Sequence, residues 1–332
     1  MPVNRATPEG TERYRERFAG RAATDHFRRQ QQLTLSSIGI GTYLGNPDTA
    51  TDVSYTNAVV RAVQLGCNVI DSAANYRFQR SERSIGDALK KLSEQGFARE
   101  EIVICTKGGY LPFDGAPPRN LREYVNETFV KPGIASFEDI VGGSHCMTPA
   151  YLQNQLDQSL RNMGLECVDV YYIHNPESQL GYVSEAEFYS RLKLAFEYLE
   201  QNRTEGKLAF YGVATWNGFR AAAGHHSLVR MVELAHEIGG EEHGFRFIQL
   251  PFNLSMPEAT TNANETLDGE RVTVVEAAKR LGVTVVASAS LLQGRIDPQA
   301  AIEFVRSNPG ITTALIGMSR VEHVEENLGQ DS

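Results

Sequence analysis

The sequence predicts an α/β protein with a (β/α)8 TIM-barrel fold. Short apolar runs alternate with longer polar segments of helical period through the 332 residues, and this alternation indicates βαβ units and a parallel sheet. Polar side chains stand at the ends of several apolar runs, and a parallel barrel gathers its strand ends on one face. Barrels of this length are commonly a single domain.

Eight short apolar runs are predicted as strands, at residues 37–41, 68–71, 102–106, 168–173, 209–214, 247–250, 283–287 and 312–316. Helices are expected between them, near residues 52–65, 80–94, 149–162, 185–202, 219–238, 270–281, 298–307 and 321–328. Thr148-Pro149 and Asp297-Pro298 each place a capping residue before a proline, which is typical of a helix start. Gly164 follows one predicted helix as a stop signal.

Three segments fall outside this alternation. Residues 1–26 form an N-terminal arm, predicted to be solvated and partly helical, with no apolar stretch typical of a secretory signal. Residues 27–36 are expected to form a hairpin at the bottom of the barrel domain, which spans residues 27–332. The long loop at 108–147 is rich in glycine and proline. Loops of this length are usually functional, so we expect it to wall or cover a substrate pocket.

Composition restricts the partners and the compartment. A net charge of −9 and a pI near 5.5 argue against nucleic acid or an anionic membrane as partner. No apolar run is long enough to cross a bilayer. The four cysteines form no CxxC pair, so a reduced, cytoplasmic compartment is the simplest interpretation. We expect a small-molecule substrate, and the oligomeric state stays open.

Four polar side chains suggest one pocket. Asp71, Lys107 and His174 each end or follow an apolar run, and Tyr76 lies five residues beyond Asp71. Hydride addition to a carbonyl carbon leaves negative charge on the oxygen, which needs a proton donor. A tyrosine has an ordinary pKa of about 10, and a nearby ammonium group lowers it. We therefore expect Tyr76 as general acid, tuned by Lys107.

The other two residues of this set have supporting roles in the same prediction. Asp71 would hold Lys107 charged and oriented, and His174 would donate a hydrogen bond to the carbonyl oxygen. Taken singly, each of the four has a simpler structural explanation as a turn, packing or solvated residue. Their joint occurrence at strand ends favours a carbonyl reductase.

Two other functional classes fit less well. Gly39, Gly41 and Gly45 loosely resemble a dinucleotide-binding glycine loop, but the spacing and the acidic residue about 20 positions later are not matched. A metal-dependent barrel hydrolase would need several ligands at strand ends, and only Asp71 and His174 qualify. No metal site is predicted, because neighbouring residues such as His225 and His226 would face different directions on a helix.

The chain resembles the aldo-keto reductase family from about residue 27 to residue 328. The motifs that carry the resemblance are Gly39-Ile-Gly-Thr-Tyr43, Asp71-Ser-Ala-Ala-Asn-Tyr76 with Ser81-Glu82 and Gly86, Cys105-Thr-Lys107, Ile173-His-Asn-Pro176, Gly206-Lys207 with Gly212-Val213, and Ile316-Gly-Met-Ser-Arg320 with its continuation to Leu328. The resemblance implies a (β/α)8 barrel that reduces aldehydes or ketones with NADPH. It implies the same roles for Asp71, Tyr76, Lys107 and His174.

The resemblance also implies a set of NADP(H) contacts. Gln249 would hold the nicotinamide carboxamide, and Arg320 would lie near a 2′-phosphate. A helix N-terminus with serine and arginine suits a phosphate. The full set of implied cofactor-binding residues is Gly41, Thr42, Asp71, Thr215, Gln249, Ser288, Leu291, Gly294, Arg295, Gly317, Ser319, Arg320, His323, Glu326 and Asn327.

Three features depart from the family pattern. Ser288 stands where many relatives have an aromatic residue that stacks on the nicotinamide, and Ala289 stands where they have serine. Thr215 and Trp216 stand where relatives often have asparagine and phenylalanine. The chain stops at Ser332, whereas relatives usually continue into a tail that closes the pocket, so either the sequence is truncated or the 108–147 loop takes that role.

The substrate itself is not readable, but its surroundings are partly predicted. Tyr43, Tyr110 and Trp216, with Phe113, suggest an apolar or sugar-stacking pocket. The β subunits of voltage-gated potassium channels share this fold, so a cofactor-binding regulatory or scaffold protein with little turnover is the alternative function.

Overall fold

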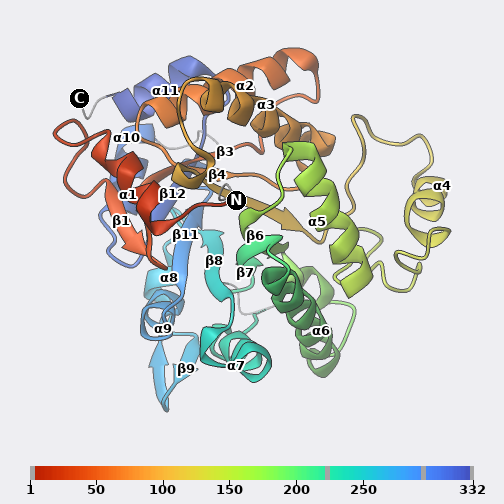
Figure 1. Ribbon diagram of the computed structural model, residues 1–332. Helices are drawn as coiled ribbons and strands as arrows, with labels where there is room; N and C mark the ends of the chain where they lie inside the picture. Colours follow the sequence, from red (N-terminus) through yellow and green to blue (C-terminus); the bar gives the residue numbers. More distant parts are fainter. Residues whose placement is uncertain (1–3, 221–224, 293–296, 330–332) are drawn as a thin grey trace.

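Eight parallel strands close into a barrel within the described part of the chain, in the order β11, β12, β3, β4, β5, β6, β7, β8. The computed structural model describes residues 4–220, 225–292 and 297–329. Helices surround the barrel (Figure 1). The predicted TIM-barrel fold is therefore confirmed, and so is the strand-to-helix alternation that predicted it.

The barrel strands are β3 (Ile38–Gly41), β4 (Val69–Asp71), β5 (Val103–Gly108), β6 (Val168–His174), β7 (Leu208–Ala214), β8 (Phe245–Pro251), β11 (Thr284–Ser288) and β12 (Thr313–Gly317). The α-helices are α1 (Pro8–Glu16), α2 (Thr49–Gln64), α3 (Arg80–Glu94), α4 (Leu121–Val125), α5 (Pro149–Met163), α6 (Glu185–Thr204), α7 (Leu228–Gly239), α8 (Glu258–Thr261), α9 (Val274–Arg280), α10 (Pro298–Arg306) and α11 (Val321–Leu328). Gly164 ends α5 in the left-handed conformation, as predicted.

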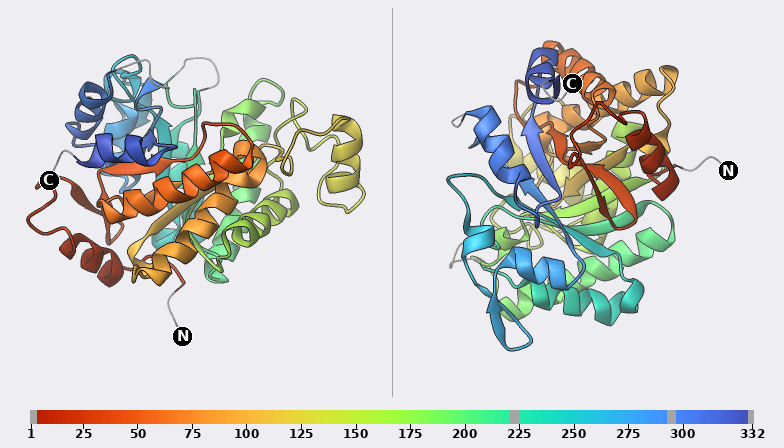
Figure 2. Two further views of the ribbon diagram at one scale, coloured as in Figure 1. Left: turned by 90° about the horizontal axis from the view of Figure 1, so that it is seen from above. Right: turned by 90° about the vertical axis from the view of Figure 1, so that its left-hand side faces the viewer.

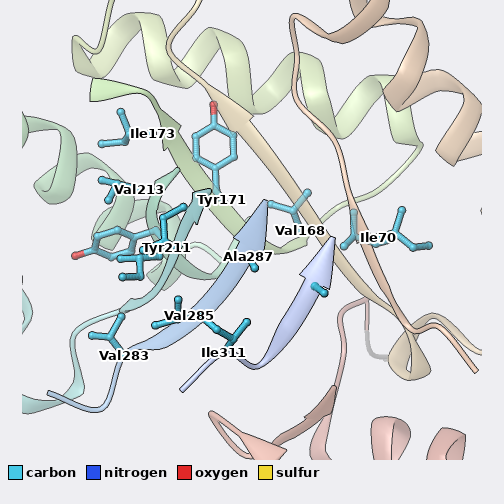
Figure 3. Packing of buried hydrophobic residues seen from close by; sticks show 14 of the residues in the cluster. Ile70, Val168, Tyr171, Ile173, Tyr211, Val213, Val283, Val285, Ala287 and Ile311 are labelled. Atoms are coloured by element: carbon cyan, nitrogen blue, oxygen red, sulfur yellow. The ribbon is translucent and has the colours of Figure 1, made fainter. Parts of the chain in front are cut away.

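Side-chain alternation along the strands separates two apolar layers. Ile70, Tyr171 and Ile173 belong to the layer between strands and helices (Figure 3). Val69 and Tyr172 belong to the smaller cluster inside the barrel. Because side chains two positions apart share a face, Asp71 continues the inward set of Val69, and His174 continues that of Tyr172. The same period carries Lys107 inward after Val103 and Cys105.

A hairpin fills the bottom of the barrel. Strands β1 (Phe27–Gln30) and β2 (Leu33–Ser36) pair antiparallel, which confirms the predicted hairpin. Leu33 and Leu35 are buried in the cluster inside the barrel. The bottom is thus sealed by apolar side chains, which leaves the opposite end for a site.

The N-terminal arm is packed rather than solvated, so that part of the prediction is wrong. Helix α1 buries Tyr14 completely, and the Tyr14 hydroxyl donates to Val63 O at 2.6 Å. Arg13 and Arg17 pair with Glu101, whose side chain is fully buried. Two arginines of the arm therefore form ion pairs with the barrel domain, and Tyr14 was too isolated in sequence to signal this burial.

The long loop projects from the barrel and carries its own small core. Helix α4 and a π-helical turn (Asn126–Val130) lie apart from the strands in Figures 1 and 2. Phe129 packs against Tyr151 of α5 with ring centroids 5.3 Å apart, and Leu111 belongs to the same small cluster. The loop leaves the barrel at the end of β5, and Tyr110, two residues later, therefore lies at the cavity described below.

Two predicted helix boundaries are wrong. The helix expected at 219–238 begins at Leu228, after an N-cap at Ser227, so His225 and His226 precede it. The helix expected at 270–281 begins at Val274, because β9 (Glu265–Leu267) and β10 (Glu270–Val272) form an antiparallel hairpin before it. Among the described residues, no helix is long and apolar enough to span a bilayer.

Candidate active site

Three neighbouring strands bring the predicted catalytic residues together at the carboxyl end of the barrel. Strand β4 pairs with β5, and β5 pairs with β6. Asp71 ends β4, Lys107 is the next-to-last residue of β5, and His174 ends β6. Tyr76 begins a short turn five residues after Asp71. The convergence predicted from strand-end positions is therefore present in the structure.

Lys107 links the carboxylate to the phenol. Its Nζ donates to Asp71 Oδ2 at 2.5 Å and to Ser72 O at 2.8 Å. The same Nζ lies 3.4 Å from Tyr76 Oη and 4.9 Å from the centre of the Tyr76 ring. Asp71 Oδ1 accepts a further hydrogen bond from Gln249 Nε2 at 2.9 Å. The ammonium group is thus held in place by two fixed acceptors, with the phenol beside it.

Burial and charge act in opposite directions on these three groups. Burial raises the pKa of Tyr76 above its ordinary value, and the Lys107 cation opposes this rise without cancelling it. Burial also raises the pKa of Asp71, again against Lys107. Burial alone would lower the pKa of Lys107, but Asp71 and Tyr76 reverse this and raise it. Lys107 therefore stays charged and acts to lower the Tyr76 pKa, as expected, but desolvation is the larger effect and the net pKa is raised.

His174 is held neutral beside the phenol. Its ring centroid lies 5.7 Å from that of Tyr76 and 5.1 Å from that of Tyr110. Burial lowers its pKa well below the ordinary value, and Lys107 and His145 add to that effect. Its Nδ1 is buried without a hydrogen-bond partner among the described residues. A neutral imidazole carries one N–H, which suits a hydrogen-bond donor to a carbonyl oxygen.

A cavity of about 800 Å³ opens at this end of the barrel. Tyr76, Asp71 and His174 line it, while Lys107 lies behind them. The predicted cofactor and pocket residues that line it are Gly41, Thr42, Thr215, Gln249, Ser288, Leu291, Gly317, Ser319, His323, Glu326, Asn327, Tyr43, Tyr110 and Trp216. One cavity thus joins three of the predicted catalytic residues to most of the residues that the resemblance assigned to a cofactor.

Four predicted cofactor or pocket residues are not among those that line the cavity. Arg320 does not line the cavity; it is exposed, and its Nε donates to His323 Nε2 at 3.2 Å. Phe113 packs against Phe78 and Tyr124 rather than lining the cavity. Gly294 and Arg295 lie outside the described residues.

Several lining residues were missed from the sequence. They were not predicted as site residues, although most of them lie next to a residue that was: Leu44, Tyr55, Asn75, Asn175, Ala214, Ala289, Ser290, Pro298 and Leu315. Ser290 is 1% exposed, and its Oγ has no hydrogen-bond partner within the described chain. Thr215 Oγ1 is likewise buried and unpartnered. The available signal for Ser290 was a serine two residues after the end of β11, the position in the chain where the barrel strands lead into the site.

A second cavity of about 500 Å³ adjoins the first. Both cavities are lined by Tyr110, Asn175 and Trp216. Tyr110 Oη and Ser178 Oγ are 2.9 Å apart, and Asn175 Nδ2 donates to Tyr110 Oη at 3.2 Å. The polar end of the site therefore continues away from Tyr76 along the segment that follows β6.

No group of three or more His, Cys, Asp or Glu side chains that could hold a metal ion occurs among the residues described here. The four cysteines are buried and unpaired with one another.

Comparison with known proteins agrees with this geometry. A putative voltage-gated potassium channel subunit beta of Schizosaccharomyces pombe is 24% identical, over 94% of this chain and 86% of its own length. The NADH-specific methylglyoxal reductase of Escherichia coli is 27% identical over 55% of this chain, and the match spans about half, 49%, of that protein.

Solved structures show the same fold. An aldo/keto reductase from Klebsiella pneumoniae, determined with NADP and acetate, aligns with a TM-score of 0.60 at 16% identity, covering 93% of this chain and 90% of the other. The holo form of an aldo-keto reductase from Bacillus halodurans gives 0.62 at 15% identity, covering 91% and 89%. Residues 37–298 match the aldo/keto reductase family, and the chain therefore belongs to that family.

Proposed function

We propose that this protein reduces an aldehyde or ketone to the alcohol with NADPH, using Tyr76 as the general acid. The observation that carries the proposal is the Lys107 ammonium, held by Asp71 and placed 3.4 Å from Tyr76 Oη at the cavity wall. A buried ammonium beside a phenol has a clear use in stabilising the phenolate that proton donation leaves behind.

The cavity fits a nicotinamide dinucleotide. Thr215 Oγ1 and Ser290 Oγ are buried polar atoms without protein partners in the described chain, and buried hydroxyls normally have one. Ser319 and His323, at the start of α11, line the same cavity. Arg320 bonds to His323 and could supply a cation to a 2′-phosphate, which favours NADPH over NADH. Solved relatives with NADP or NADPH bound support this choice.

The residues divide the chemistry among themselves. A nicotinamide cofactor supplies the hydride when bound. Tyr76 donates its phenolic proton to the carbonyl oxygen as charge develops there, and Lys107 stabilises the resulting phenolate. His174, neutral because it is buried, donates a hydrogen bond to the same oxygen and orients it. Gln249 bonds to Asp71, so it fixes the carboxylate as well as being a candidate contact for the carboxamide.

The substrate we propose is an uncharged carbonyl compound with polar substituents. Neither cavity is lined by a lysine or an arginine among the described residues. Carboxylates and phosphates are usually bound by such cations. Trp216 is 42% exposed at both cavities and could cover an apolar face of the substrate. A strong preference for small anionic substrates would contradict this part of the proposal.

A scaffold function with little turnover is the second candidate. The relative described as a potassium channel subunit beta matches 94% of this chain, which favours the alternative. Asp71, Tyr76 and His174 at one cavity, with Lys107 in contact with Asp71 and Tyr76 behind them, favour catalysis. Partner binding that is unchanged by Tyr76→Phe would fit a scaffold.

The test combines a cofactor titration with turnover. Purified protein is titrated with NADPH and with NADH by fluorescence, and NADPH consumption is then followed with a panel of neutral aldehydes and ketones. We expect NADPH-selective binding and turnover in the native protein. Tyr76→Phe removes the phenolic proton while keeping the ring, so it should bind NADPH normally and lose turnover.

Two outcomes would contradict the proposal. Failure to bind either cofactor would remove the reductase assignment altogether. Undiminished turnover in Tyr76→Phe would leave the reductase assignment and remove Tyr76 as the acid.

A further inference from the structure

The turn that carries Tyr76 has an unusual backbone. Arg77, Phe78 and Gln79 have φ values of 48°, 58° and 70°, so three consecutive residues other than glycine lie in the left-handed region. Residues with a Cβ disfavour this region, and such a run persists only where the surroundings hold it in place. The contacts of these three residues therefore show what the turn is built to hold.

Arg77 ties the turn to the segment that follows β3. Its Nε donates to Asn46 O at 2.9 Å, and its Nη2 donates to Asp48 O at 3.3 Å and to Asp52 Oδ1 at 2.5 Å. The guanidinium lies 5.2 Å from the centre of the Tyr55 ring. The arginine side chain is 1% exposed, whereas that of Asp52 is 25% exposed.

Two features of Arg77 are locally destabilising. Its Nη1 is buried and has no hydrogen-bond partner in the described chain, and an unmet buried donor is destabilising. The left-handed backbone adds to that cost. A glycine would adopt this conformation freely, so the contacts of the arginine side chain have to account for an arginine here.

The next two residues tie the turn to the long loop. Phe78 O accepts from Gly115 N at 3.0 Å, and the Phe78 and Phe113 rings lie 5.9 Å apart. Gln79 Nε2 donates to Phe113 O at 3.1 Å. The turn is thus fixed on one side by the segment after β3 and on the other by the 108–147 loop.

The segment that Arg77 holds is one wall of the cavity. Tyr43, Leu44 and Tyr55 line the cavity, and the Tyr55 hydroxyl donates to Leu44 O at 2.7 Å. The Tyr43 ring packs edge-on against Tyr76, with centroids 5.0 Å apart. A shift of this wall relative to the turn would therefore move the phenol against its neighbours.

We propose that Arg77 is a positioning residue that sets the Tyr76 phenol against Lys107 by locking the left-handed turn to residues 46–52. The inference rests on the proposed reductase function for its kinetic consequence and on the geometry alone for its structural one. Arg77 does not line the cavity, so it acts through Tyr76 rather than on the substrate.

The test replaces Arg77 with glycine, which fits the left-handed turn without strain and removes the guanidinium contacts to residues 46–52 and to the Tyr55 ring. Arg83→Ala is the matched control, because Arg83 also pairs with an aspartate, Asp114, but is 41% exposed and lies in regular helix. We expect Arg77→Gly to fold with a lower thermal midpoint, because a buried ion pair and two further hydrogen bonds are lost. It should keep its NADPH affinity and lower kcat about 10- to 100-fold, the effect of a misplaced catalytic group. The control should keep the native kcat.

A second variant protects the test against misfolding. Asp52→Asn removes the charged partner of Arg77 and, with it, the pair between Asp52 and Arg80 at the start of α3, and kcat should fall in the same direction by a smaller factor. Arg77→Lys, which keeps the charge and loses the forked donor geometry, should recover only part of kcat. Native kcat in Arg77→Gly, or full recovery by lysine, would overturn the proposal.

A readout without turnover separates this proposal from the proposed function. Tyrosine labelled with 13C at Cζ gives a signal for Tyr76 that is assigned by its loss in Tyr76→Phe. In the cofactor-free protein, Arg77→Gly should shift this signal and Arg83→Ala should not. An unshifted signal would overturn the positioning role. Absence of turnover in the native protein, with the signal shifted, would overturn only the reductase assignment.

Discussion

A buried aspartate stands at each end of the barrel, and their partners differ in kind. Asp169, on β6 near the bottom, accepts from Ala6 N at 2.6 Å, Ile104 N at 2.7 Å and Arg99 Nη2 at 2.7 Å. Asp71, at the top, accepts from Lys107 Nζ and Gln249 Nε2. The partners of Asp169 are structural groups remote from the cavity, whereas the main partner of Asp71 also contacts a phenol at the cavity wall.

The surroundings of the two ends differ in the same way. Leu33 and Leu35 fill the bottom, while His174 Nδ1, Thr215 Oγ1 and Ser290 Oγ at the top have no partner among the described residues. A buried charge stabilises a fold where its partners are complete. It can serve chemistry where polar groups around it are left for a ligand.

The largest expected effect is on the bottom aspartate. Asp169→Asn removes the charge that pairs with Arg99 and unbalances two backbone hydrogen bonds. We expect the free energy of unfolding to fall by about 3–5 kcal/mol, as for other broken buried pairs, measured by urea denaturation. The kcat of the remaining folded protein should be unchanged, and a lower kcat there would show that the two ends are coupled.

The top aspartate should show the reverse pattern. Asp71→Asn leaves the hydrogen bond from Lys107 to Ser72 O in place. It also replaces a buried carboxylate by a neutral amide, and burial of that carboxylate is unfavourable, as its raised pKa indicates. We expect kcat to fall by about 100-fold, roughly 2.7 kcal/mol of barrier, with a smaller loss of unfolding free energy than in Asp169→Asn. Equal losses of stability in the two variants would remove the distinction between the two ends.

The unpartnered hydroxyls should matter to the ligand and not to the fold. Ser290→Ala and Thr215→Val each delete a buried group that has no described protein partner, so little stability is lost. We expect NADPH affinity to fall about 10-fold for each, roughly 1.4 kcal/mol, with an unchanged thermal midpoint. Ser93→Ala, at an exposed position of α3 that does not line the cavity, is the control and should keep the native affinity. A lower thermal midpoint with native affinity would mean that these hydroxyls serve the fold.

The smallest expected effect is a pH dependence of stability at the top end. Burial lowers the pKa of His226 to about 3; it stacks on Phe188 and lies 3.7 Å from Glu177 Oε2, with His225 beside it. The unfolded chain binds a proton below pH of about 6.5, and the folded chain does not. The contribution of His226 to the free energy of unfolding is therefore fully present above pH of about 6.5. It is lost progressively as the pH falls toward the pKa of His226 in the folded protein.

Replacing His226 tests that dependence. His226→Phe should flatten the acid limb of the unfolding free energy, by about 1 kcal/mol between pH 6.5 and pH 5.5. The comparison is made by denaturant titration at the two pH values. An unchanged slope would mean that another buried histidine, such as His145, whose pKa burial lowers to about 4, accounts for the acid limb.

The sequence predicted what depends on period and order. Alternating apolar runs predicted the barrel, and inward residues at the ends of β4, β5 and β6 predicted that Asp71, Lys107 and His174 converge. The β9–β10 hairpin was missed because a short strand pair of mixed polarity has no clear period. The net rise of the Tyr76 pKa was missed because desolvation depends on packing that strand-end positions do not reveal.

The left-handed turn after Tyr76 was also out of reach. The turn consists of Arg77, Phe78 and Gln79, and it contains no glycine or asparagine that would indicate a positive φ. Their conformation is imposed by contacts with residues 46–52 and with the 108–147 loop. Local propensity cannot predict a conformation that distant segments impose.

The most direct test of Tyr76 as general acid is a single-turnover measurement of NADPH oxidation by native protein and by Tyr76→Phe, with a neutral aldehyde that the native protein turns over. We expect the rate to fall by about 10²- to 10⁴-fold while NADPH binds both proteins equally. The raised Tyr76 pKa also predicts that the native rate holds as the pH rises to about 10. A native rate in Tyr76→Phe would contradict the account.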